Sequence, residues 1–244
     1  MKFSVITVTY NDLDNLKVTY NSVKNQTFTD YEFLVVDGGS TDGTVDYLEE
    51  IKNNDSHVRY ISEKDRGIYD AMNKGVNLSG GEYVLFLGAA DTFYSNEILS
   101  EVNSLLNGSI DVFYGKVMFS SGENKGQELG TKLNFFSILL DRYIAHQSVF
   151  AKRDVALKYP FNLSYRFLAD QDFMMNAREG KRKLKFFDKV ICYYDGYGFS
   201  SDLSNRQDLI DERIRLIYNH SKFAFYIRSL GHLIKGEGKY FIEN

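Results

Sequence analysis

The first part of the chain alternates between short apolar runs and stretches of helical period. The runs are rich in β-branched residues and end in turn-forming residues, which is typical of buried strands. They predict strands at Phe3–Thr9, Tyr31–Val36, Val58–Ser62 and Glu82–Leu87. Between the runs, apolar residues recur every three or four positions, as on the buried face of a helix. This order predicts an α/β fold with a mainly parallel central sheet flanked by helices.

The predicted helices end near Lys24, span about Thr44–Lys52, follow Ile68, and span about Ser95–Leu106. The later part of the chain is less regular, and its expected elements depend on shorter patterns. Strands are expected at Ile110–Tyr114, Lys116–Ser120, His146–Phe150 and Val190–Tyr194, and helices at Ala169–Arg178 and about Arg206–Asn219. The polar stretch Ser121–Thr131 predicts an exposed loop.

Composition narrows the function classes. The chain has 244 residues and a net charge of −4, so no positive field favours binding to nucleic acid. Its single cysteine, Cys192, excludes an internal disulfide, fits a reducing compartment and lies in an apolar strand typical of a core. No apolar run is long enough to span a bilayer, and the start MKFSVITVTY lacks the layout of a signal peptide. We therefore expect a cytoplasmic protein.

One turn carries the first candidate chemistry. Asp37 ends the second predicted strand and is followed by Gly38 and Gly39 in the stretch VVDGGSTDGT. Open α/β sheets bind ligands at the carboxyl ends of their strands. A carboxylate at this position can accept hydrogen bonds from a nucleobase N–H or a ribose hydroxyl. The alternative is an ordinary turn with a solvated aspartate.

Several stretches together resemble the family 2 inverting glycosyltransferases, whose fold is called GT-A. The version in this chain is similar to that of bacterial O-antigen, capsule and colanic-acid transferases, and the resemblance covers about residues 3 to 200. The stretches that carry it are SVITVTYN (Ser4–Asn11), QTFTDYEFLVVDGGSTDGT (Gln26–Thr44), SEKDRGIYDAMNKGVNLSGGEYVLFL (Ser62–Leu87), HQSVF (His146–Phe150) and ADQDF (Ala169–Phe173). The resemblance implies a nucleotide-sugar donor and a GT-A fold.

The resemblance also implies where the donor binds. The donor site would consist of Thr9, Tyr10, Asn11, Asp37, Asp65, Arg66 and Ala90. Asp37 would accept from the base, and the Arg66 guanidinium is suited to a phosphate. The alternative for Arg66 is an exposed ion pair with an aspartate.

Asp91 resembles the last aspartate of the family's metal motif, and would hold Mn²⁺ or Mg²⁺ against the diphosphate. The chain departs from the commoner forms of this motif, because it reads Gly88-Ala89-Ala90-Asp91. A form with Asn-Ser-Gly-Asp exists in the family, so one aspartate can suffice. Ala90 nevertheless removes one side chain that could contact ribose or metal.

Asp170 aligns with the general base of the family. Its carboxylate would take the proton of the acceptor hydroxyl during attack on the anomeric carbon. Asp172 is the second candidate, with a helix-dipole role as its alternative. His146 and Gln147 resemble acceptor-side residues that orient the diphosphate or the acceptor, although a histidine at a strand start is as often structural.

The resemblance implies a transferase domain at 1–203, with a nucleotide-binding half at about 1–92 and an acceptor half at about 93–203. Residues 204–244 would form a C-terminal helical extension. In its tail, Lys222–Ile242, basic residues alternate with aromatic ones. This composition suits peripheral contact with anionic lipid at the inner face of the plasma membrane, and equally suits packing on the catalytic domain or on a second subunit.

The expected function is inverting transfer of a hexose or N-acetylhexosamine from a UDP-sugar. The acceptor would be a surface glycan or a polyprenyl-diphosphate-linked sugar. Two other classes compete with this interpretation. The Gly88–Asp91 stretch also fits a nucleotide-sugar-binding or scaffold protein with weakened catalysis. A dinucleotide-dependent oxidoreductase is disfavoured, because Thr9-Tyr10-Asn11-Asp12 lacks the glycines of a pyrophosphate turn.

Overall fold

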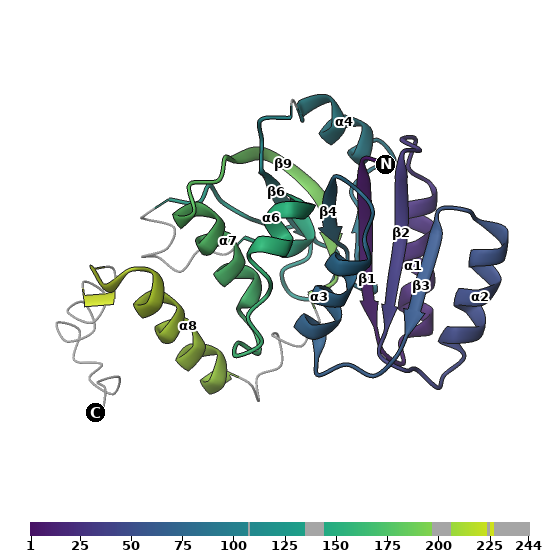
Figure 1. The fold of residues 1–244 in the computed structure, drawn as a ribbon, viewed down its shortest axis with the longest axis horizontal. Helices are drawn as coiled ribbons and strands as arrows, with labels where there is room; N and C mark the ends of the chain where they lie inside the picture. The colour runs from purple at the N-terminus through teal and green to yellow at the C-terminus, as the bar shows by residue number, and fades with distance from the viewer. Residues whose placement is uncertain (107, 135–143, 197–205, 224, 227–244) are drawn as a thin grey trace.

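The computed structural model describes residues 1–106, 108–134, 144–196, 206–223 and 225–226. The strands are β1 (Phe3–Thr9), β2 (Tyr31–Asp37), β3 (Val58–Ser62), β4 (Tyr83–Phe86), β5 (Thr92–Phe93), β6 (Val112–Phe119), β7 (Glu128–Leu129), β8 (Val149–Lys152) and β9 (Leu184–Tyr194). They form one sheet in the order β3-β2-β1-β4-β8-β6-β9-β5, with β7 beside β6 (Figure 1). Strands β3, β2, β1 and β4 run parallel, whereas β8 is antiparallel to β4.

Helices cover both faces of this sheet (Figure 1). They are α1 (Leu13–Lys24), α2 (Thr44–Asn54), α3 (Ile68–Leu78), α4 (Ile98–Leu105), α6 (Arg153–Lys158), α7 (Ala169–Glu179) and α8 (Arg206–His220), with a 3₁₀ turn, η1 (His146–Ser148). The predicted α/β fold with a mainly parallel sheet is therefore confirmed. The pattern did not predict the short elements β5, β7 and α6.

Alternation along the strands builds two separate cores. Ile6 and Val36 face the layer that contains α3, α7 and α8, whereas their neighbours Val5 and Val35 face the layer that contains α1, α2 and α4. Successive strand residues point to opposite faces, so the central strands must be apolar throughout. This explains why their sequences read as continuous hydrophobic runs rather than as alternating ones.

Gly115 lies inside one strand rather than between two. We predicted separate strands at Ile110–Tyr114 and Lys116–Ser120, but β6 continues through Gly115 with a shift of register on β9. A Cβ on Gly115 would lie 2.7 Å from Ile191 Cγ1 and 2.8 Å from the Lys189 carbonyl oxygen. The glycine therefore permits close approach of a neighbouring strand at a bulge, and does not mark a turn.

Two further boundaries differ from the prediction. His146, Gln147 and Ser148 form the 3₁₀ turn η1 instead of the start of a strand, because Ser148 N–H and its hydroxyl both donate to the Ala145 carbonyl oxygen (3.0 and 2.8 Å). The predicted strand Val190–Tyr194 is the end of the longer β9, whose first half contains exposed charged residues. A strand segment with exposed charged residues does not produce an apolar run, so the hydrophobic pattern does not predict it.

Helix α8 packs on α7 through a buried histidine at its end. The two ring nitrogens of His220 lie 2.8 Å from Asp172 Oδ1 and 2.8 Å from Glu179 Oε1, both on α7. Leu216 of α8 belongs to the same apolar core as the inner face of α7. None of the described helices is long and apolar enough to cross a membrane. Most of the predicted tail, Lys222–Ile242, lies outside the described residues.

The contact between His220 and the two carboxylates predicts a pH-dependent stability. Burial alone lowers the pKa of His220, but hydrogen bonds to Asp172 and Glu179 outweigh burial, so its pKa is raised above 6.5. The stabilisation is complete below pH 6.5 and is lost as the pH rises through the raised pKa. We expect His220→Gln to lower the free energy of unfolding by about 2 kcal/mol at pH 6 and by less at pH 9. Urea unfolding at both pH values measures this.

The control is Asn21→Gln on α1, because Asn21 is exposed and does not titrate, so its effect on stability should be the same at both pH values. A His220→Gln variant whose deficit is equal at pH 6 and pH 9 would contradict the charged contact.

Candidate functional site

The turn after β2 is organised around the Asp37 carboxylate. Asp37 is fully buried and its Oδ2 accepts from Gly39 N–H (3.1 Å), Ser40 N–H (3.0 Å) and the Ser62 hydroxyl (2.6 Å). The Ser40 hydroxyl donates to the other oxygen. A carboxylate offers about four acceptor positions, and all are used here. Asp37 therefore holds the turn together, and its contact with a base stays a prediction.

The tips of β1 and β2 are tied to each other by Asn11. Its backbone N–H donates to the Ser40 hydroxyl (2.7 Å) and its side-chain oxygen accepts from Thr41 N–H (2.8 Å). Asn11 thus connects two turns. Within the described part of the chain, the buried Thr9 hydroxyl has no hydrogen-bond partner. An unpaired buried hydroxyl is costly, and a ligand hydroxyl or amide would satisfy it.

Tyr10 and Asp65 flank the backbone of Gly38. A Cβ on Gly38 would lie 3.3 Å from Tyr10 Cδ2 and 3.1 Å from Asp65 Oδ2. The Tyr10 side chain is 65% exposed. An aromatic face, a carboxylate and a bare peptide thus meet at the strand tips. This combination can stack a flat ring and accept its N–H, which fits a nucleobase.

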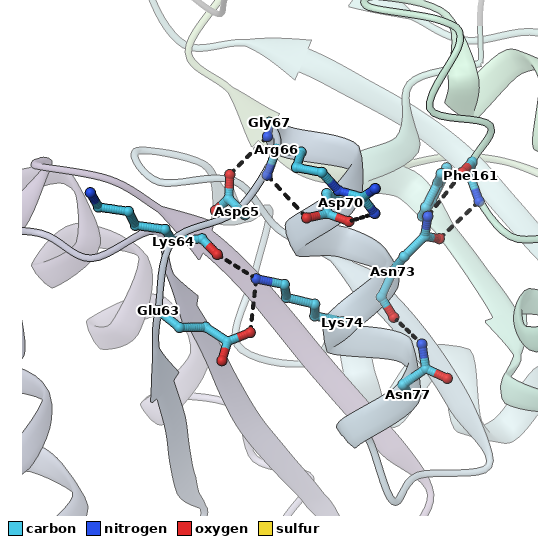
Figure 2. Close-up of polar contacts among 10 residues, drawn as sticks. All are labelled: Glu63, Lys64, Asp65, Arg66, Gly67, Asp70, Asn73, Lys74, Asn77 and Phe161. Carbon is cyan, nitrogen blue, oxygen red and sulfur yellow. Dashed lines mark hydrogen bonds and ion pairs between the residues drawn. The ribbon is translucent and has the colours of Figure 1, made fainter.

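Arg66 is engaged with Asp70 and points away from the sheet tips. Its backbone N–H donates to Asp70 Oδ2 (3.0 Å) and its guanidinium to Asp70 Oδ1 (2.8 Å), while Gly67 N–H donates to Asp65 Oδ1 (2.9 Å) (Figure 2). The Arg66 side chain is 77% exposed, so a phosphate would have to draw it from both water and Asp70. Its phosphate contact stays a prediction.

A cleft of about 800 Å³ collects the other predicted residues. Its lining includes Ala90, Asp91, His146, Gln147 and Asp170. These residues come from the segment after β4, from η1 and from the first turn of α7. The volume lies in the range of small-molecule sites in proteins. The structure therefore brings together the predicted metal, phosphate and base positions, although they are far apart in sequence.

Asp91 is buried at the base of this cleft. Burial raises the pKa of Asp91 to about 6, although the Asp195 N–H (3.1 Å from Oδ1), the charge of His146 and the Gln147 side chain all oppose the shift. The raised pKa means that the surroundings of the carboxylate stabilise its negative charge poorly, and a bound divalent cation would stabilise that charge. Asp91 fits a metal site with one protein carboxylate, in which diphosphate oxygens and water complete the ligands.

Asp170 is held in the cleft by His146. Its Oδ2 lies 3.2 Å from His146 Nδ1, and its Oδ1 accepts from Gln171 N–H (2.8 Å). Gln171 also exchanges two hydrogen bonds with the backbone of Ile144, at 2.6 and 3.3 Å. Helix α7 and the segment leading into η1 are therefore joined at two points. The His146–Asp170 contact and the Gln171–Ile144 contacts together hold Asp170 at a fixed position on the cleft wall.

Asp172, the second candidate base, faces the other way. It is buried, and its two carboxylate oxygens contact His220 Nε2 and Asn176 Nδ2 at 2.8 and 2.9 Å. It is not among the residues that line the cleft. Asp172 therefore fastens α8 to α7, which is a structural role.

Seven charged or amide side chains in the cleft lining were not predicted from the sequence: Asp12, Asn15, Asn124, Arg166, Gln171, Asp195 and Arg213. Arg213 belongs to α8 and Arg166 to the loop before α7. No local motif marks these positions. They enter the cleft only because folding brings together segments that are distant in sequence. Arg166 and Arg213 are the two arginines of the described lining, which contains no lysine.

Comparison with known proteins identifies the class and then the family. The described fold is that of GT-A glycosyltransferases. Residues 4–172 match the model described as "Glycosyl transferase family 2", and the chain belongs to this family. It is therefore a glycosyltransferase of family 2.

Relatives of known name support this assignment. A PGL/p-HBAD biosynthesis glycosyltransferase of Mycobacterium bovis is 34% identical over 201 residues, which cover 80% of this chain and 77% of the relative. Glycosyltransferase GlyA of Streptococcus pneumoniae is 25% identical over 228 residues, which cover 93% of this chain but 31% of that protein.

Solved structures show the same fold. S. aureus TarS 1-349 in complex with UDP-GlcNAc has a TM-score of 0.70 at 23% identity, and the match covers 91% of this chain and 68% of that one. The mannosyltransferase PcManGT from Pyrobaculum calidifontis in complex with GDP-Man and Mn²⁺ has a TM-score of 0.67 at 14% identity, covering 98% and 76%. In this chain, no three His, Cys, Asp or Glu of the described residues cluster as metal ligands. A metal would depend on Asp91 and on the donor.

Ala90 carries backbone strain that can be tested. Its φ of 74° lies in the left-handed region, which a Cβ disfavours by about 1–2 kcal/mol. We expect Ala90→Gly to raise the free energy of unfolding by about 1 kcal/mol, measured by urea unfolding. Ala89→Gly is the control, because the φ of Ala89 is not positive; it should lower stability by about 0.5 kcal/mol. Equal effects of the two changes would show that the Ala90 backbone is unstrained.

Asp91 predicts the same direction of pH dependence as His220, a loss of stability as the pH rises, but at lower pH. Its pKa rises from 3.8 to about 6 on folding, so the stability from proton binding is complete below pH 3.8 and is lost as the pH rises through 6. At 1.36 kcal/mol per unit the loss is roughly 3 kcal/mol by pH 8. In EDTA, the stability of Asp91→Asn relative to that of the parent protein should therefore increase from pH 4.5 to pH 8. Urea unfolding at the two pH values measures the difference.

Asp14→Asn is the control, because this aspartate is 98% exposed and should show no such trend. Asp91→Asn and Asp14→Asn with parallel pH profiles would mean that burial does not perturb Asp91.

Proposed function

We propose that this protein is an inverting glycosyltransferase that uses a UDP-sugar as donor. The observation that carries the proposal is a cleft whose lining includes Asp91, His146 and Asp170 together. His146 Nδ1 contacts Asp170 Oδ2, and its charge acts on the buried Asp91. A site for the leaving diphosphate and a base for the acceptor are thus adjacent, as one displacement requires.

The strand tips would hold the nucleoside of the donor. Tyr10 would stack on the base, and the Asp65 carboxylate would accept a hydrogen bond from it. The Thr9 hydroxyl, which has no hydrogen-bond partner in the described part of the chain, would bond to a polar group of the donor. Asp37 and Asn11 would act mainly by holding these turns in shape. Ala90, beside Asp91, leaves room without contributing a polar group. Arg66 would reach a phosphate only after it released Asp70.

Asp91 would hold Mn²⁺ or Mg²⁺, and His146 and Gln147 would orient the diphosphate beside it. When bound, the cation neutralises charge on the leaving diphosphate. Asp170 would accept the proton of the acceptor hydroxyl as that oxygen forms its bond to the anomeric carbon. The bond from this carbon to the diphosphate oxygen breaks in the same step, and its electron pair leaves with the nucleotide. A single displacement inverts the configuration.

For the acceptor we propose a growing surface glycan or a polyprenyl-diphosphate-linked sugar, reached from the cytoplasmic side. Support comes from the cleft itself, where Arg166 and Arg213 add positive charge to a lining rich in carboxylates. The proposed membrane contact of the basic and aromatic tail concerns residues that are mostly outside the described ranges.

A second candidate function is a nucleotide-sugar-binding or scaffold protein with weakened catalysis. It is favoured by one observation, that Asp91 is the sole acidic residue of the Gly88–Asp91 stretch. Calorimetric titration with UDP and GDP separates the candidates. UDP binding that requires Mn²⁺ and is lost in EDTA supports the transferase, whereas metal-independent UDP binding favours the binding protein. Failure of both nucleotides to bind would remove the donor-site assignment.

The base assignment predicts the effect of Asp170→Asn. The amide cannot take a proton, so we expect sugar transfer or UDP release from a UDP-sugar to fall by about 10²–10⁴-fold. The affinity for UDP with Mn²⁺ should be unchanged, because Asp170 is assigned to the acceptor side. Circular dichroism and calorimetry on the variant verify folding and binding. Full turnover by a folded Asp170→Asn protein would show that another group is the base.

A further inference from the structure

Helix α7, which carries Asp170 in its first turn, begins without a cap of its own. The residue at its N-cap position is Leu168, which has no side-chain acceptor for the free N–H groups of the first turn. These N–H groups belong to the backbone that positions Asp170. Some other part of the molecule must therefore fix this turn.

The Tyr69 hydroxyl, from α3, occupies this place. It donates to the Phe167 carbonyl oxygen at 2.7 Å, and the Tyr69 side chain is buried. Burial and then the negative charge of Asp170 raise the pKa of Tyr69, while the N–H groups of Asp170 and Ala169 oppose that rise. The hydroxyl oxygen thus lies against the uncapped start of α7. A side chain of α3 therefore holds the backbone just before the base-bearing helix.

Glu212, from α8, holds the same loop from the opposite side. Its two carboxylate oxygens accept from the backbone N–H groups of Arg166 and Phe167, the latter at 2.9 Å. The N–H of Phe167 therefore donates to Glu212 of α8, and its carbonyl oxygen accepts from Tyr69 of α3. Three residues later the chain reaches Asp170.

Helix α3 is itself firmly placed, so Tyr69 can serve as a fixed reference. Asn73, one turn further on, exchanges two hydrogen bonds with the Phe161 backbone, both at 2.9 Å (Figure 2). A Cβ on Gly75 would lie 2.6 Å from Ile6 Cγ2, so this glycine lets α3 approach β1 closely. Tyr69 and Asn73 lie four residues apart and so share one face of α3, directed at the loop before α7.

We propose that Tyr69 and Glu212 are positioning residues that set the place of the Asp170 carboxylate relative to the donor. Neither is required to touch substrate; each acts through the Phe167 backbone and the first turn of α7. The catalytic part of this inference rests on the proposed function of Asp170 as base. The structural part, that α3 and α8 hold the loop that leads into α7, stands on the contacts alone.

The test uses Tyr69→Phe, which removes the hydroxyl and keeps the ring. Its control is Arg153→Gln, because Arg153 of α6 contacts the opposite end of α3 from Tyr69, where it donates to the Ser79 hydroxyl and the Asn77 carbonyl oxygen (3.2 and 3.0 Å). Hydrogen exchange of the 168–175 segment is measured in both variants of the full chain. We expect exchange there to accelerate about tenfold in Tyr69→Phe and to stay at the parental rate in Arg153→Gln.

Kinetics provide the second readout, as UDP release from UDP-glucose and UDP-N-acetylglucosamine with Mn²⁺. Displacement of the base should lower kcat about 10- to 100-fold in Tyr69→Phe, with KM for the donor unchanged. Arg153→Gln should retain parental kcat. Glu212→Gln, which keeps one acceptor oxygen, should show a smaller kcat loss of the same kind. It also keeps the test valid if Tyr69→Phe fails to fold.

The outcomes separate the two levels of the inference. Unchanged exchange and unchanged kcat in Tyr69→Phe and Glu212→Gln would overturn it, as would a kcat loss of equal size in Arg153→Gln. If the parent protein released no UDP from either donor, the proposed function would fail for these sugars. The exchange data alone would then decide whether Tyr69 and Glu212 fix the start of α7.

Discussion

The antiparallel pairing of β4 with β8 is the contact on which the site depends. β4 is parallel to β1 on one side and pairs with β8 on the other, with Leu85 opposite Phe150. Because the two strands run in opposite directions, the segment after β4 meets the segment before β8 at one edge of the sheet. That edge therefore receives Asp91 from one strand and His146 from the other. Helix α7 then contributes Asp170, the third of the predicted residues that lie together in the cleft.

The buried aspartates Asp37 and Asp91 differ in how far their surroundings balance the carboxylate charge. Asp37 is buried but fully hydrogen-bonded, whereas Asp91 is buried with fewer donors and has a pKa raised to about 6. The first arrangement is complete without a ligand and serves structure. The second is favourable only when positive charge is added, which is the condition expected of a residue that binds a cation together with an anionic donor.

Local features of the fold could be predicted well, because each depends on a short stretch of sequence. The parallel strands and the Asp37 turn follow from apolar runs and glycines, and the family motifs indicated Asp91, His146 and Asp170, which the structure places in one cleft. The rest depends on distant parts of the chain. The entry of Arg213 into the cleft follows from tertiary packing and leaves no local pattern. The ion pair of Arg66 with Asp70, four residues further on, is by contrast a local contact, which the sequence left open as the alternative to a phosphate contact.

Helix α8 shows most clearly why sequence position does not separate scaffold from site. Its sequence reads as an amphipathic appendage, yet Leu216 joins the core beside α7 and His220 binds two carboxylates of that helix. Glu212 holds the backbone just before Asp170, and Arg213, the next residue, lines the cleft. Neighbouring side chains of one helix therefore hold the wall of the site and contribute to its lining. Removal of α8 would expose apolar surface and release the loop that leads to the base, so its loss would impair stability and the site together.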